Sequence, residues 1–162
     1  MIHIATVQPA AWRYGAIVMF EIDGKYAPGN GFASKELPFL LPLFALDFPE
    51  VAGCLHGSIN LILDRPLLVV KPDHRSKPLD WRGDPNRLDG YDFLRIEFEA
   101  PIGTASVKAW LYIPHVCQHR KYLNVHEVIT TTKLPMKHGD RCRIRIYRPV
   151  EELPYQKIAV VL

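Results

Sequence analysis

GSINLILD, the stretch from Gly57 to Asp64, predicts a turn that leads into a buried strand. Gly57 permits a tight turn with positive φ, where a side chain would clash. Ser58 and Asn60 then project from the same side of the strand, because strand side chains alternate with period two. A hydroxyl and an amide oxygen arranged in this way can share one hard cation or one phosphate. The alternative is that both side chains only satisfy backbone groups of the turn.

The composition around this strand predicts one folded domain over residues 1–162. The chain has 162 residues, of which 48% are hydrophobic, and this is enough for a core of its own. Its formal net charge of +3 argues neither for nor against nucleic acid as a partner. Basic residues nevertheless gather between His115 and Lys121 and again between Arg141 and Arg148. Such groups suit a phosphate-bearing ligand, although alternate arginines on a strand more often form its solvated face.

The cysteines indicate a reducing environment. Cys54, Cys117 and Cys142 are widely spaced and include no Cys-x-x-Cys pair, so they fit free thiols in the cytoplasm. No signal peptide is recognisable in the sequence. The most apolar stretch, Leu37 to Phe48, is too short and too interrupted by proline to span a bilayer. We therefore expect a soluble cytoplasmic protein that makes no membrane contact.

The pattern of apolar residues predicts an all-β fold. Short runs rich in β-branched and aromatic residues recur along the chain with turn signals between them, which is typical of small barrels. One or two short helices are expected, the clearest from Glu36 to Phe48, where Pro38 and Pro42 restrict or kink it. Asp23 to Lys25 carries a turn signal. Besides the strand in GSINLILD, the expected strands are Ile2 to Val7, Tyr14 to Ile22, Leu67 to Val70, Phe93 to Ala100, Ser106 to Ile113, Val125 to Ile129 and Arg141 to Tyr147.

Two segments are expected outside the barrel. Residues 71–90 are polar and repeatedly interrupted by proline and glycine. They predict a long surface excursion, because a buried loop would leave its backbone polar groups without partners. Residues 149–162 begin with Pro149 and are expected to form a C-terminal tail.

A glycine-rich loop precedes the expected helix. It reads Gly29-Asn30-Gly31-Phe32-Ala33, and glycines at alternate positions let a backbone approach a ligand and present N–H groups to phosphate. The loop has neither the Gly-Lys-Ser/Thr of a Walker motif nor Rossmann spacing. An ordinary surface loop is the alternative interpretation.

This ordered set of motifs resembles the archaeal CTP-dependent riboflavin kinases, a family of small six-stranded cradle-loop barrels. The loop at Gly29 to Ala33 stands at the place of the family's nucleotide loop. The stretch Gly57 to Asp64 is similar to the family's Pro-Gly-Thr-Leu-Asn signature, with a helix and an aromatic-Pro step in between. The run from Ala109 to Asp140 is similar to the family's C-terminal motifs. His56 stands here in place of the signature proline, Ser58 in place of threonine, and the residues of the glycine-rich loop differ.

The resemblance implies a role for each matching residue. Ser58 and Asn60 would bind Mg²⁺, which takes a few protein oxygens and completes its octahedron with phosphates and water. Glu127 would orient or deprotonate the attacking hydroxyl of the flavin ribityl chain; the alternative is a surface strand residue. The nucleotide and the flavin would further contact Gly29, Asn30, Gly31, Phe32 and His119.

The resulting hypothesis is phosphoryl transfer from a nucleotide, CTP by the resemblance, to riboflavin, which gives FMN. A second hypothesis is a non-catalytic barrel that binds a nucleotide or flavin as a sensor. A third, an interaction module for nucleic acid or protein, requires Arg141, Arg143 and Arg145 to form an exposed stripe with aromatic residues. Nothing else in the sequence favours nucleic acid. The sequence leaves the identity of both substrates and the oligomeric state open.

Overall fold

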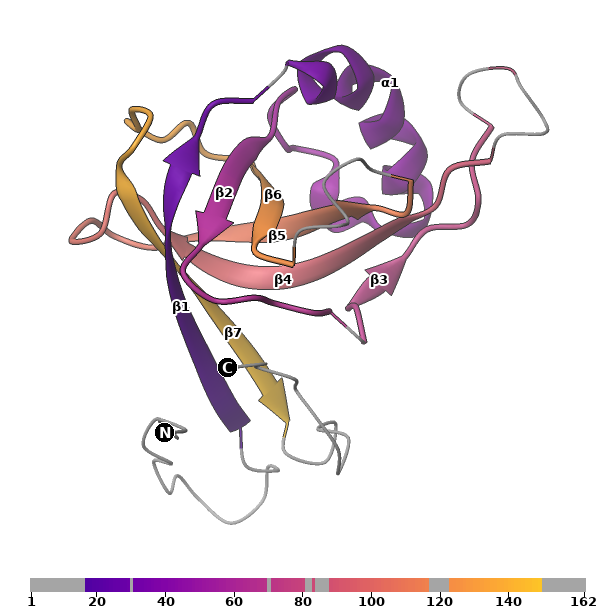
Figure 1. Ribbon diagram of the computed structural model, residues 1–162. Helices are drawn as coiled ribbons and strands as arrows, with labels where there is room; N and C mark the ends of the chain where they lie inside the picture. Colours follow the sequence, from indigo (N-terminus) through magenta and orange to yellow (C-terminus); the bar gives the residue numbers. More distant parts are fainter. Residues whose placement is uncertain are drawn as a thin grey trace.

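Six antiparallel strands close into a barrel, with one further strand and one α-helix outside it (Figure 1). The structure is a computed structural model, and it describes residues 17–29, 31–69, 71–80, 83, 88–116 and 123–149. The barrel order is β4-β5-β6-β2-β1-β7, and pairing of β7 with β4 closes it. The elements are β1 (Ile17–Ala27), α1 (Phe32–Asp47), a 3₁₀ turn η1 (Pro49–Val51), β2 (Ile59–Leu63), β3 (His74–Arg75), β4 (Tyr91–Glu99), β5 (Val107–Pro114), β6 (Val125–Thr130) and β7 (Arg141–Pro149).

The barrel interior is filled by alternate side chains of every strand. In β4 the inward residues are Leu94, Ile96 and Phe98, and in β7 they include Cys142 and Ile144. Both sets are the ones that the alternating pattern predicts, because a strand exposes one face to the core and the other to its surroundings. The predicted all-β barrel with six closed strands is therefore confirmed at this level.

The helix α1 builds a second core on the outside of the barrel. Its Phe44 is 2% exposed and makes edge-to-face contacts with Tyr91 and Phe93 of β4, each with ring centroids 5.0 Å apart. The helix runs for 16 residues and continues through Pro38 and Pro42. Each proline removes one backbone hydrogen bond, and burial of the helix against the aromatic face of the sheet offsets this loss.

The predicted turn at Asp23 to Lys25 is wrong, because these residues lie within β1 and pair with β2 and β7. Gly24 is needed there for close packing: a Cβ atom would stand 2.7 Å from the backbone oxygen of Ile62. A glycine in a strand often marks such a close approach of two backbones. Gly57 does not take a positive φ either; its N–H donates to the oxygen of Leu55, 2.8 Å away.

Other boundaries also differ from the predictions. The predicted helix Glu36 to Phe48 is Phe32–Asp47 in the structure, so it begins inside the predicted glycine-rich loop. Residues 67–69 are not a strand, and the excursion over 71–90 contains β3 and a bridge between Leu79 and Asp89. Pro149 ends β7 and does not begin a tail. The predicted strand at Ile2 to Val7 and the rest of the tail lie outside the described residues. Within the described part of the chain, no helix has the length and apolar character needed to cross a membrane.

Candidate functional site

Strands β2 and β6 bring three of the predicted site residues together. Asn60 of β2 stands opposite Glu127 of β6 in the sheet register, and on its other side opposite Ala27 of β1. Leu61 fills the barrel interior, so Asn60 faces outward, because neighbouring side chains of a strand point to opposite faces. Ser58, Asn60 and Glu127 are all half-buried, so a ligand can reach them from solvent.

A direct hydrogen bond joins the turn before β2 to β6. The Oγ of Ser58 donates to Oε2 of Glu127 over 2.6 Å. The hydroxyl therefore uses its only hydrogen as a donor to the carboxylate, and its two lone pairs remain available as acceptors. Ser58 is thus oriented as an oxygen ligand, and the carboxylate of Glu127 is held in one position.

The glycine-rich loop closes over the same residues. A Cβ atom on Gly29 would stand 2.1 Å from Nδ2 of Asn60, so the backbone of Gly29 lies directly against the asparagine amide. Only glycine permits this approach without moving Asn60. Asn30, which separates the two glycines of the loop, and His119 lie outside the described residues.

The loop ends at the amino terminus of α1. Gly31 is the N-cap residue with φ 74° and ψ 9°, and it makes no side-chain capping hydrogen bond. The first turn carries no acidic residue. A helix start of this kind offers unsatisfied N–H groups and a partial positive charge to an anion. Phe32, the first residue of the helix, leaves 56% of its surface exposed beside this point.

Two tyrosines under α1 border the site, and sequence analysis did not single them out. Tyr112 of β5 stands opposite Glu127 in the register, and its ring stacks on that of Tyr91 with centroids 5.4 Å apart. Burial raises the pKa of Tyr112, and the nearby Tyr91 and Glu127 raise it further. The phenol therefore stays protonated. The available signal was that Tyr91 and Tyr112 belong to neighbouring strands and that Tyr112 faces the aromatic Phe93 in the register.

The donor atoms at this site fit a magnesium ion. Ser58 and Asn60 offer a hydroxyl and an amide oxygen and Glu127 offers a carboxylate, all hard oxygen ligands. No group of three or more His, Cys, Asp or Glu gathers anywhere among the described residues, so a cation here would depend largely on neutral oxygens and on its ligand's phosphates. Comparison of the sequence with models of known protein families and with curated proteins gave no match.

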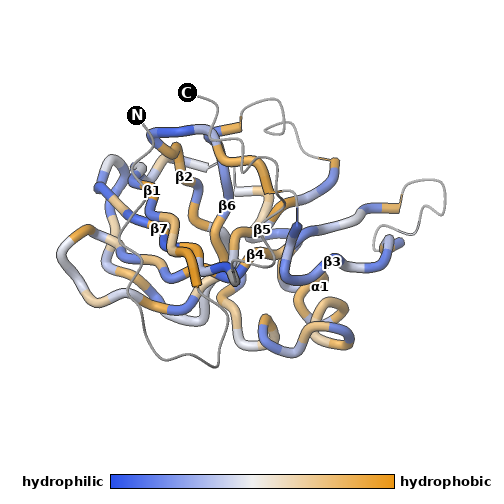
Figure 2. The backbone as a smooth tube through the Cα atoms, turned by 90° about the horizontal axis from the view of Figure 1, so that it is seen from below, coloured by the Kyte–Doolittle hydropathy of each residue, from blue (hydrophilic) through white to orange (hydrophobic). Residues whose placement is uncertain are grey.

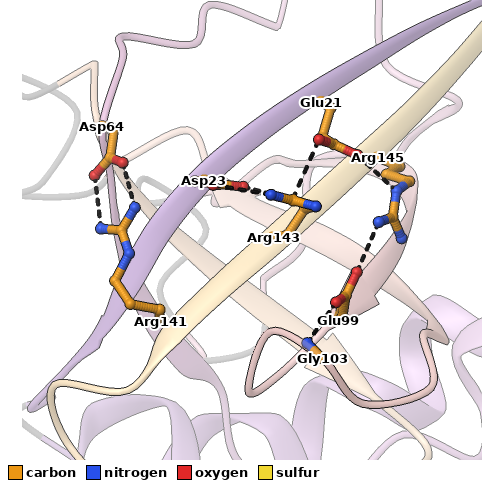
Figure 3. A network of polar contacts seen from close by, with 8 residues as sticks. All are labelled: Glu21, Asp23, Asp64, Glu99, Gly103, Arg141, Arg143 and Arg145. Atoms are coloured by element: carbon orange, nitrogen blue, oxygen red, sulfur yellow. Dashed lines mark hydrogen bonds and ion pairs between the residues drawn. The ribbon is translucent and has the colours of Figure 1, made fainter.

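The arginines of β7 form a separate network on the outer face of β1, β4 and β7 (Figure 3). Arg143 binds Asp23 through Nε at 2.6 Å, Arg141 binds Asp64 and Arg145 binds Glu99. The third hypothesis requires these three arginines to form an exposed stripe with aromatic residues, and in the structure each of them is instead paired with a carboxylate. The network comprises Glu21, Asp23, Asp64, Glu99, Arg141, Arg143 and Arg145.

This network makes a testable prediction for acid stability. The hydrogen bond from Arg143 lowers the pKa of Asp23 below its ordinary value. A carboxyl with a depressed folded-state pKa stabilises the fold above about pH 4 and loses that contribution below it. Arg143→Gln should therefore lower the free energy of unfolding by about 1 kcal/mol at pH 7. This loss relative to the native protein should become smaller below about pH 4.

Urea unfolding at neutral and acidic pH measures this difference directly. Lys133→Gln is the matched control, because it removes an exposed cation from a loop outside the network. The free energies of unfolding of Arg143→Gln and the native protein are compared at each pH. If their difference stays constant down to acidic pH, the ion pair with Asp23 contributes nothing to stability.

Proposed function

We propose that this protein is a Mg²⁺-dependent small-molecule kinase of the riboflavin kinase type, built on a cradle-loop barrel. It would transfer the γ-phosphoryl group of a nucleotide, CTP by the resemblance, to the 5′-hydroxyl of riboflavin and so give FMN. The observation that carries the proposal is the meeting of three motifs that are distant in the sequence. Gly29 packs against Asn60, and Ser58 of the same motif donates to Glu127.

Different residues would bind the nucleotide phosphates and the magnesium ion. The backbone of the glycine-rich loop and the first N–H groups of α1 would hold the nucleotide phosphates. Ser58 and Asn60 would hold the magnesium ion, which when bound offsets the negative charge of the phosphates. Most of the catalysis in phosphoryl transfer comes from such positioning and charge neutralisation.

Glu127 is the group suited to the acceptor side. Its Oε2 is held by Ser58, and this leaves Oε1 to accept a hydrogen bond from the attacking hydroxyl. As the new O–P bond forms and the bond to the leaving nucleoside diphosphate breaks, the proton of that hydroxyl passes to Glu127. Tyr112, which is buried and stacked on Tyr91, stands opposite Glu127 in the sheet register.

The first experiment is a titration of the purified protein with riboflavin and CTP, with and without Mg²⁺, followed by chromatography for FMN. We expect flavin fluorescence to be quenched on binding, and FMN to form only with Mg²⁺ and to disappear with a chelator. ATP in place of CTP tests the nucleotide. Binding without FMN would leave a non-catalytic nucleotide or flavin barrel, and the absence of any binding would reject the proposal.

A further inference from the structure

Two apolar side chains beside the candidate site belong to neither core of the protein. Ile62 of β2 and Val125 of β6 stand opposite each other in the sheet register. Ile62 lies between Leu61 and Leu63, which fill the barrel interior, so Ile62 faces outward and its partner Val125 faces the same way. Both are half-buried, and neither is a member of the barrel core or of the second core under α1. They form an apolar strip on the outside of the barrel.

This apolar strip is continuous with the candidate site. Asn60 and Glu127 form the facing pair two residues along the same two strands, and a step of two residues returns to the same face of a sheet. Two residues of a strand cover about 7 Å. The strands β2 and β6 lie side by side in Figure 1, and Figure 2 shows hydrophilic and hydrophobic residues on both. The outer face therefore places an apolar pair directly beside the polar pair.

A lysine borders the apolar strip on the side of β1. Lys25 stands opposite Ile62 in the register of β1 and β2, and it is exposed. Its ammonium group has three hydrogens to donate. Ligand sites commonly combine apolar side chains with a few polar groups that fix the orientation of the ligand. This surface therefore suits a flat ring with carbonyl oxygens better than a free sugar alcohol, which has no flat apolar face to bury.

We propose that Ile62 and Val125 form the subsite for the flavin ring of the acceptor, with the ribityl chain extending toward Glu127. This inference rests on the proposed function and adds to it the residues that select the acceptor. Riboflavin is a flat fused ring joined to a chain whose terminal hydroxyl receives the phosphoryl group. With the ring on the apolar strip, the chain covers the distance of about 7 Å between the two residue pairs, and Lys25 donates to a ring carbonyl.

Binding of lumiflavin, measured by flavin fluorescence, tests the ring subsite without the chain. Lumiflavin is the same ring with a methyl group in place of the ribityl chain. The double variant Ile62→Thr/Val125→Thr keeps two β-branched strand residues but makes the strip polar. We expect it to bind both lumiflavin and riboflavin about ten-fold more weakly, because less apolar surface is removed from water. Glu127→Gln should bind lumiflavin like the native protein, because the ring does not reach this carboxylate.

Ile17→Thr is the matched control for these substitutions. Ile17 is an exposed isoleucine at the start of β1, about 26 Å along this strand from Lys25, and its variant should bind both flavins like the native protein. Initial rates of FMN formation give a second readout. The double variant should raise the KM for riboflavin about ten-fold and leave the KM for CTP unchanged, because the ring contact is made in the ground state and in the transition state alike.

These readouts separate the ring subsite from the kinase activity. If FMN forms but the double variant binds lumiflavin as tightly as the native protein, Ile62 and Val125 are not the ring subsite and the proposed function stands. If no FMN forms but the double variant loses the lumiflavin binding of the native protein, the ring subsite stands and the proposed function fails. A native protein that does not bind lumiflavin, or a native dimer that the double variant dissociates in sedimentation, would overturn the inference.

Discussion

Gly29→Ala is expected to lower kcat/KM for FMN formation on the order of 10²-fold while leaving the barrel folded. The new methyl group would stand 2.1 Å from Nδ2 of Asn60, a distance that no two such atoms share. The clash is with the end of a side chain and Gly29 has no positive φ, so the protein relieves it by moving the Asn60 amide and not the backbone. If Asn60 holds the ion as proposed, its displacement by about 1 Å would cost on the order of 10²-fold in kcat/KM.

A double-mutant cycle separates this mechanism from a general disturbance of the loop. Asn60→Ala should lose activity to the same extent as Gly29→Ala, and the double variant should be no worse than either one. Such non-additivity is the signature of two residues that act through one contact. We would measure initial rates of FMN formation across Mg²⁺ concentrations, and unfolding midpoints as a check on the fold.

Gly57→Ala is the matched glycine control for this cycle. It lies three residues before Asn60, has no positive φ, and an added Cβ would meet nothing within 4 Å. Its variant should keep full activity. Normal activity of Gly29→Ala, or losses that add in the double variant, would show that Gly29 does not position Asn60.

The outline of this site could be predicted from the sequence because it depends on local rules. The period-two alternation of a strand places Ser58 and Asn60 on one side whatever the rest of the fold does. The same alternation predicts the inward faces of β4 and β7. The hydrogen bond between Ser58 and Glu127 was not predicted, because a contact between residues 69 positions apart depends on sheet register.

The errors arise where tertiary contacts override local signals. Asp23 to Lys25 has the composition of a turn, but pairing with strands on both sides keeps it extended, and Gly24 serves close packing. Pro38 and Pro42 weaken a helix locally, yet α1 continues through both because its inner face is buried on the barrel. The partners of the β7 arginines could not be predicted from local signals either, because the carboxylates of Glu21 and Glu99 come from β1 and β4.

Glu127→Gln is expected to lower kcat for FMN formation by roughly 10²–10⁴-fold, the usual contribution of a general base. The amide has nearly the same shape as the carboxylate, and its oxygen can still accept the hydrogen bond from Ser58 that is 2.6 Å long in the native protein. Nucleotide binding and the KM for CTP should therefore change little. A loss confined to kcat indicates an interaction made in the transition state.

The strength of this test lies in a comparison with Ser58→Ala. That variant keeps the carboxylate but removes both the proposed metal oxygen and the hydrogen bond to Glu127, so its defect should appear in the Mg²⁺ concentration needed for activity as well as in kcat. Glu97→Gln, on β4 where Glu97 binds Tyr147, is the control for loss of a carboxylate elsewhere on the barrel. A Glu127→Gln variant with native kcat would exclude proton transfer to this residue and leave it only the role of holding Ser58 in place.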